Sequence, residues 1–254
     1  MAALIDDLPA QVLRAQVRLY ACCARLNAAT DGEALHDLRI ALRTLRSLLK
    51  PVAEWATCAA LQQRAAELGR LSGPLRDLEV LLAELRRRGA HSQLQARQAQ
   101  LRQGYSALLA SRQLQALFIA FDDFPARWYQ AAAQGQLKGM GKRIGKRLAK
   151  QQRRLLAALA DPAHDRHQLR LLIKRVRYGA EAYPQLARLP RSHHGQLKAA
   201  QSALGDWHDH LQWLARAEAE ADLAPYVESW QIALRAAEQR ADQALLGLTS
   251  RFLG

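Results

Sequence analysis

Leucines recur along most of this chain at spacings of three and four residues, with polar and charged residues between them. That spacing places the apolar side chains on one face of an α-helix. Ala, Leu, Gln, Arg and Glu are abundant, and the alternating β-branched runs that would indicate strands are missing from the sequence. The pattern therefore predicts an all-α protein made of amphipathic helices.

The stretch HDLRIALRTLRSLLK, residues 36–50, shows this division of faces most clearly. At ~100° per residue, one face of the helix carries five leucines. The opposite face carries a narrow row of cations headed by a histidine: His36, Arg39, Arg43, Arg46 and Lys50. The leucine face predicts burial, and the row of cations predicts a basic ridge on the surface.

The same pattern occurs again in HQLRLLIKRVRYGAEAY, which begins at His167. Arg170, Lys174 and Arg177 follow this histidine at offsets of 3, 7 and 10 residues, as in the earlier row. Further on, GPLRD at 73–77 corresponds to GDWHD at 205–209, with nearly the same shift along the chain. The repeated order of these motifs predicts an internal duplication.

We expect the halves to be repeats of about 1–131 and 132–254 within one domain that covers 1–254. No linker-like segment separates them. Each half contains several long helices with short connections, which is typical of a helical bundle. The predicted architecture is therefore two antiparallel four-helix bundles related by a pseudo-two-fold axis, an arrangement that would bring both cationic rows onto a shared surface.

Some helix boundaries follow from Pro, Gly and capping residues. The first helix is expected to begin near Pro9 with Asp7 as candidate N-cap, and Asp31 is the candidate cap of the second helix. The segment FDDFP at 121–125 predicts a break after a long helix. Gly205 leaves two interpretations open, either two helices or one bent helix.

The charge balance points to a polyanionic partner. Lys and Arg total 37 against 23 Asp and Glu, a net charge of +14. Such a balance favours nucleic acid, a phosphate polymer or an anionic membrane surface, although a basic protein can also be merely soluble. The strongest basic run has few acids to neutralise it, and we expect three of its residues to add to the basic surface: Lys142, Lys146 and Lys150.

Other features limit where the protein acts. Its three cysteines, Cys22, Cys23 and Cys58, fit neither a disulfide framework nor a zinc site, and buried thiols in a reducing compartment are expected. The N-terminal residues do not resemble a signal peptide, and no stretch of ~18 apolar residues occurs. We expect a cytoplasmic protein without a membrane span or a cofactor. The sequence leaves the oligomeric state open.

Four segments in order, HDLRIALRTLRSLLK, LRDLEVLLAEL, HQLRLLIKRVRYGAEAY and LGDWHDHL, resemble the repeated motifs of the CHAD domain, the conserved histidine α-helical domain. The resemblance covers nearly the whole chain. Each motif alone is degenerate, but four at the right spacing are specific. The resemblance implies two four-helix bundles with internal symmetry, a basic central surface and binding of inorganic polyphosphate, in several members with association to polyphosphate granules.

The resemblance assigns the binding residues position by position. It implies His36, Arg39, Arg43 and Arg46 in the first motif, and His167, Arg170, Lys174, Arg177 and Tyr178 in the second. Lys50 departs from the repeat because its counterpart is Glu181, and His208 stands where the first half has Arg76. The ExExK-type motif of a CYTH phosphohydrolase domain, often fused to this family, is missing here, so we expect a free-standing module.

These observations lead to the hypothesis of a non-catalytic polyphosphate-binding protein. A row of cations spanning ~15–20 Å suits a polymer of phosphates better than one small anion. Nucleic acid is the alternative ligand, because contacts of Arg and Lys with phosphate do not distinguish the two polymers. Single-strand binders add aromatic stacking platforms, and the rows contain only Tyr178.

An HD-type metal-dependent phosphohydrolase is a further alternative. It is suggested by three clusters: His36-Asp37, His164-Asp165 and His208-Asp209-His210. Such an enzyme needs His and Asp side chains that converge on a metal. Adjacent residues on a helix diverge by ~100°, so each pair directs only one member to a shared point. We therefore expect no catalytic residue and no metal site.

Overall fold

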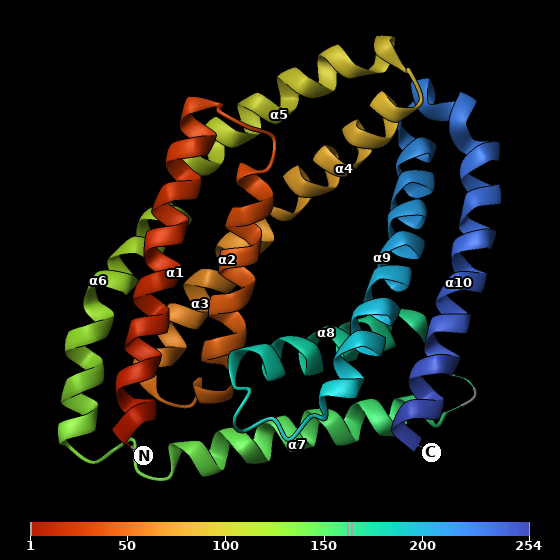
Figure 1. The fold of residues 1–254 in the computed structure, drawn as a ribbon. Helices are drawn as coiled ribbons and strands as arrows, with labels where there is room; N and C mark the ends of the chain where they lie inside the picture. Colours follow the sequence, from red (N-terminus) through yellow and green to blue (C-terminus); the bar gives the residue numbers. More distant parts are fainter. Residues whose placement is uncertain (1, 162, 164, 254) are drawn as a thin grey trace. The chain divides into compact units, whose positions relative to one another are not determined.

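The computed structural model describes residues 2–161, 163 and 165–253, which form helices joined by short turns (Figure 1). These residues include no strand, and the all-α prediction is confirmed. No described helix is long and apolar enough to cross a membrane. The chain divides into two compact units, Met1–Gly145 and Lys146–Gly254, and the boundary falls within α7, Met140–Leu159.

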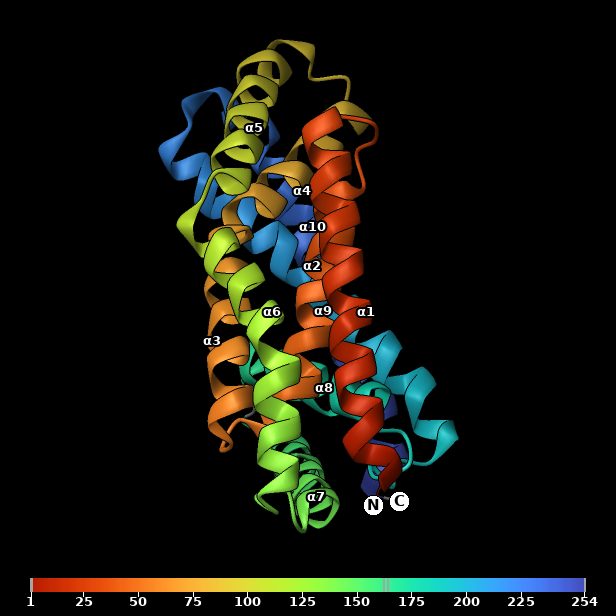
Figure 2. The same ribbon diagram turned by 90° about the vertical axis from the view of Figure 1, so that its left-hand side faces the viewer.

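The first unit contains six helices before α7, together with two 3-10 turns, Lys50–Val52 and His91–Gln93. Four of the helices form a closed ring of contacts, in which α1 and α3 each pack against both α2 and α6 (Figures 1 and 2). α4 packs against α5. The bounds are α1 Ala2–Ala28, α2 Ala34–Leu49, α3 Ala56–Leu71, α4 Gly73–Arg87, α5 Leu94–Leu109 and α6 Arg112–Ala133.

The second unit consists of the C-terminal part of α7 followed by three helices, with a 3-10 segment, Ala221–Tyr226, before the last. These are α8 Arg166–Ala182, α9 Arg191–Ala219 and α10 Val227–Leu253. α9 packs against both α8 and α10 (Figure 1). All four helices supply one core, which includes Leu155, Ile173, Leu204 and Leu245. The internal duplication stays a prediction. So does the expectation of two four-helix bundles whose repeats meet near residue 131.

The expected break at FDDFP was wrong. α6 runs through Pro125 without interruption, and the break before it lies at Ser111, whose Oγ accepts a hydrogen bond from the Leu114 N–H at 3.2 Å. Phe121, Phe124 and Trp128 are all buried on the same face of α6. Burial of three aromatic side chains outweighs the cost of an interior proline, about 3 kcal/mol.

The expected start of the first helix near Pro9 was also wrong, because α1 begins at Ala2 and includes both Asp7 and Pro9. A proline has no N–H to donate to the carbonyl four residues earlier, here that of Ile5. The indole Nε1 of Trp128 donates to this carbonyl at 2.8 Å instead. Packing between α1 and α6 therefore compensates for the proline.

Asp31 does not act as the helix cap that the sequence suggested. The N-cap position of α2 is Glu33, which makes no side-chain capping bond. Asp31 Oδ1 accepts the N–H of Glu33 at 2.9 Å, in the turn just before the helix. Its carboxylate thus orders the turn and not the first helical residues.

The two halves differ where the sequence left an alternative open. α9 is continuous through Gly205, whereas the corresponding stretch of the first half is divided into α3 and α4 at Ser72. Pro74 lies in the first turn of α4 and cannot donate to a preceding carbonyl. Asp206 occupies the corresponding position of α9 and retains its N–H, so the longer helix continues.

The cysteines are all free thiols, as expected. Cys22 and Cys58 are buried and Cys23 is partly buried. Burial raises the pKa of Cys23 to about 11 and that of Cys58 to about 12. Thiols with such high pKa values are poor nucleophiles at neutral pH, so these side chains act as small core residues.

Candidate functional site

The first stripe is the row His36, Arg39, Arg43, Arg46 and Lys50 of α2 and the turn that follows it. The opposite face of α2 is core, and Leu38, Leu42 and Leu45 are each no more than 2% exposed. The stripe residues are half-buried or exposed. The predicted division of the helix into a buried leucine face and a basic ridge is therefore what the structure has.

Arg39 anchors the first stripe to α3. Its Nη1 donates to the carbonyl of Gly69 and to Ser72 Oγ, both at 3.0 Å. Burial lowers the pKa of Arg39, while the carboxylate of Asp77 acts in the opposite direction. Because an arginine stays charged under all ordinary conditions, the anchor is a permanent cation at the C-terminal end of α3.

Gly69 also lets the next turn of the stripe lie close to α3. A Cβ at this glycine would be 3.3 Å from Arg46 Nη1, so the guanidinium lies close to this position of α3. Lys50 is exposed, and its N–H still donates to the Arg46 carbonyl, which continues the helical path beyond α2. The first stripe thus extends as one row from His36 to Lys50.

Asp37, the residue after His36, forms an ion pair with Arg25 of α1. Arg25 of α1 donates to Asp37 at 2.6 Å and holds Asp31 with two hydrogen bonds, at 2.7 and 2.8 Å. The hydrogen bonds from Arg25 lower the pKa of Asp31 to about 2. Asp37 therefore pairs with a cation of α1, as expected of a structural ion pair.

The second stripe is the row His167, Arg170, Lys174 and Arg177 of α8. Its helix also has a buried opposite face, which includes Leu169, Ile173 and Val176. His167 is exposed, and the other three residues are half-buried. Asp165 caps α8 by accepting the N–H of His167 at 2.8 Å, which fixes the first turn of this stripe.

The end of the second stripe differs from that of the first. Arg177 forms an ion pair with Glu181 at 2.9 Å, and its guanidinium carbon lies 5.3 Å from the centroid of the Tyr178 ring. Tyr178 is only 8% exposed, and its hydroxyl accepts a hydrogen bond from Gln201 Nε2 at 2.8 Å. The Tyr178 ring thus packs against the Arg177 guanidinium and exposes little surface to a ligand. Its contact with polyphosphate stays a prediction.

His208 of α9 joins the second stripe, although sequence reasoning did not select it. The rings of His167 and His208 have centroids 5.9 Å apart. Burial, with the positive charges of Arg170, His167 and Lys174, lowers the pKa of His208 to about 4. The sequence feature that could have identified His208 is its correspondence to Arg76 of the first half. In the repeat alignment, the imidazole of His208 stands where the first half has a guanidinium.

The three lysines predicted on α7 form a row of their own. Lys142, Lys146 and Lys150 are exposed. They lie on the side of α7 away from Leu148, which packs against α8 at Gly179, where a Cβ would be 2.9 Å from Leu148 Cδ2. The row is separate from the second stripe, because Leu148 packs against Gly179, on the side of α8 opposite Arg170, Lys174 and Arg177.

The two histidines of the 208–210 cluster have different partners. His210 Nδ1 lies 2.7 Å from the Asp206 carbonyl and its ring packs edge-on against Trp213, whereas His208 lies beside His167. His164 is outside the described residues. Within the described ranges, no group of three or more His, Cys, Asp or Glu side chains is placed to hold a metal ion.

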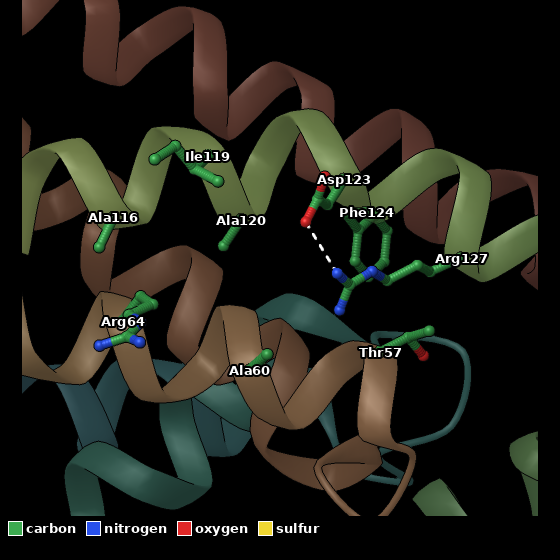
Figure 3. A pocket seen from close by; sticks show the side chains of 9 residues that line it. All are labelled: Thr57, Ala60, Arg64, Ala116, Ile119, Ala120, Asp123, Phe124 and Arg127. Atoms are coloured by element: carbon green, nitrogen blue, oxygen red, sulfur yellow. Dashed lines mark hydrogen bonds and ion pairs between the residues drawn. The ribbon is translucent and has the colours of Figure 1, made fainter.

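A hollow in the first unit lies between α3 and α6 and is lined by residues such as Arg64, Asp123 and Arg127 (Figure 3). Arg127 is paired with Asp123 at 2.9 Å, as Figure 3 shows, and Arg64 with Glu67 at 3.0 Å. These cations are neutralised by their neighbours. The hollow contains no stripe residue and is not a comparable anion site.

Comparison with known proteins identifies the family and the fold of the chain. The model of the CHAD domain family matches residues 11–218. The crystal structure of the CHAD domain from the plant Ricinus communis has the same fold, with 22% identity, coverage of 99% of this chain and 92% of that chain, and a TM-score of 0.72. PptA from Streptomyces chartreusis is similar over 94% of this chain and 98% of its own, with 20% identity and a TM-score of 0.56. No curated protein sequence matches. The chain belongs to the CHAD domain family.

Proposed function

We propose that this protein binds inorganic polyphosphate through the first and second stripes without catalysing a reaction on it. The observation that carries the proposal is that each stripe is fixed on a helix whose other face is core. The cations are therefore held at helical spacing over ~15–20 Å, longer than one phosphate group. A linear polymer of phosphates can contact several of them at once, which supports this ligand class.

The electrostatics of the second stripe support an anionic ligand. Arg170 and Lys174 act on His208 as positive charges, and burial adds to their effect. Cations crowded in a partly desolvated place repel one another, and a polyanion relieves that repulsion. Membership of the CHAD family fits the same ligand class, and binding of this kind would recruit the protein to polyphosphate granules in the cytoplasm.

The aromatic residues favour polyphosphate over nucleic acid. Tyr178, which follows Arg177 of the second stripe, is buried, and the Arg177 guanidinium lies over its ring. Trp128 and Trp230 are fully buried in the cores of their units. Nucleic-acid binders that accept single strands stack bases on exposed rings, and phosphate contacts alone suffice for a polymer without bases.

The direct test measures binding and turnover in the same sample. Purified protein is titrated into fluorescently labelled long-chain polyphosphate at near-physiological salt, and the chain length is then analysed by gel electrophoresis. We expect tight binding, a steep loss of affinity with added salt, and an unchanged chain length with or without Mg²⁺ or Mn²⁺. Absence of binding contradicts the binding proposal, and shortened chains contradict the non-catalytic proposal.

A further inference from the structure

The second unit contains a pair of histidines that the proposed function does not yet use. His167 lies in the first turn of α8 and His208 near the middle of α9, and their rings are inclined at 49° with centroids 5.9 Å apart. The two helices pack directly against each other (Figure 1). A ligand on the N-terminal half of the second stripe would therefore lie close to both rings.

The charges that face His208 from α8 are positive. They come from Arg170, Lys174 and, when protonated, His167. On α9 itself, Asp206 and Asp209 are two residues before and one residue after His208, so their side chains diverge from it by ~160° and ~100°. The nearest acids along its own helix thus point elsewhere.

Acidic residues also occur on the other two elements that pack against α9, which are α10 and the 3-10 segment. On α10, Asp242 and Glu238 face Arg166 of α8, at 2.7 and 4.0 Å. The acid of the 3-10 segment, Asp222, lies beyond the C-terminal end of α9. In the described part of the chain, the charges that lower the pKa of His208 come from α8.

A histidine in such surroundings is neutral at neutral pH. Burial, Arg170, His167 and Lys174 together hold the pKa of His208 at about 4. A bound phosphate would bring a negative charge close to the ring, and a nearby anion favours the imidazolium form. The imidazolium carries an N–H at each ring nitrogen, so either nitrogen can donate to a phosphate oxygen.

We propose that His208 is a further polyphosphate contact and that it takes up a proton when the polymer binds to the second stripe. The proposal rests on the proposed function and adds a pH dependence to it. The first unit has no counterpart, because Arg76 occupies the corresponding position, carries a permanent charge and pairs with Glu79 at 2.8 Å. Of these two corresponding positions, only the one in the second half, His208, carries a side chain that titrates near neutral pH.

The proposal predicts the direction of the pH effect. The pKa of His208 is higher in the bound state than in the free protein, so affinity rises as the pH falls through the bound-state value. It stops rising near the free-state pKa of about 4. For the uptake of one proton centred in the neutral range, affinity would be about tenfold higher at pH 6 than at pH 8. Long chains are used because their internal phosphates keep a constant charge over this range.

The experiment compares the wild type with three variants at constant ionic strength, by titration calorimetry in buffers of different ionisation enthalpy. His208→Arg is expected to bind well at both pH values and to lose most of the proton uptake. His208→Gln is expected to lose the same uptake and to bind about tenfold more weakly than the wild type at pH 6. His167→Gln is the matched control, which should retain at least half of the uptake. Circular dichroism checks that each variant is helical.

The outcomes separate the two proposals. Normal binding with undiminished proton uptake in both His208 variants overturns the role of His208 and leaves polyphosphate binding intact. Loss of the uptake in His167→Gln alone also overturns it, because the coupling would then belong to the other ring. Absence of polyphosphate binding by the wild type at every pH overturns the proposed function and this inference with it.

Discussion

The two stripes have the same spacing of cations but different surroundings. In the first, Arg39 is fixed to the α3 backbone and the row continues to the exposed Lys50. In the second, the row ends at Arg177, which Glu181 neutralises in part, and it is joined by His208. One pattern along a helix therefore supports a row that extends to an exposed lysine in one unit and a row joined by a second histidine in the other.

This comparison shows that the neighbouring helix decides what a cation on a stripe can do. Gly69 of α3 presents a carbonyl to Arg39, and Ser72, the residue after α3, presents a hydroxyl; these two acceptors hold the guanidinium and are themselves uncharged. A glutamate one turn away does neutralise Arg177, at the cost of charge available to a ligand. We expect the first stripe to supply more of the pH-independent affinity.

The largest effect is expected when both rows are broken together. Reversal of Arg43 and Lys174 to Glu places a negative charge in the middle of each stripe, and we expect a loss of affinity for long-chain polyphosphate of about 100-fold or more. The slope of log affinity against log salt should fall by about 2. Fluorescence anisotropy over a series of salt concentrations measures both.

The matched control reverses two exposed arginines outside the stripes, Arg14→Glu on α1 and Arg235→Glu on α10. It produces the same change in net charge. If this control loses as much affinity as the stripe variant, binding depends on overall charge and the stripes are not the site.

A smaller effect concerns the anchor of the first stripe. Arg39→Ala removes two hydrogen bonds and leaves the buried Ser72 hydroxyl with fewer partners, so we expect a loss of about 1–2 kcal/mol in the free energy of unfolding. Arg46→Ala, which removes an exposed side chain of the same stripe, should cost less than about 0.5 kcal/mol. Urea denaturation compares the two, and equal losses would contradict the anchoring role.

The smallest effect makes the second stripe resemble the first. Glu181→Lys frees Arg177 and adds a cation at the position that corresponds to Lys50, and we expect affinity to rise about threefold. Glu218→Lys, at an exposed position near the end of α9, is the control for the same charge change. Equal gains in both variants would show that the place of the charge does not matter.

The amphipathic pattern was sufficient to predict the helical class and both stripes, because burial of a leucine face fixes where the charges of the same helix must lie. It failed at Pro9 and at FDDFP. In both places long-range packing of Trp128 and its aromatic neighbours compensates for a proline, and such packing has no signature in a local window.

The sequence also could not rank the residues within a stripe. Arg39 and Arg170 occupy equivalent positions, yet only the structure shows that Arg39 reaches Gly69 and Ser72. The burial of Tyr178 and the approach of His208 to His167 likewise depend on how α8 and α9 pack. Contacts between residues far apart in the chain are set by packing that periodicity alone does not specify.

The central claim is that the stripes recognise polyphosphate and not polyanions in general. The most direct test is competition at near-physiological salt between labelled long-chain polyphosphate and unlabelled duplex or single-stranded DNA, compared at equal phosphate concentration. We predict that unlabelled polyphosphate displaces the label and that either form of DNA leaves most of it bound. Displacement by DNA at equal phosphate concentration would contradict the claim.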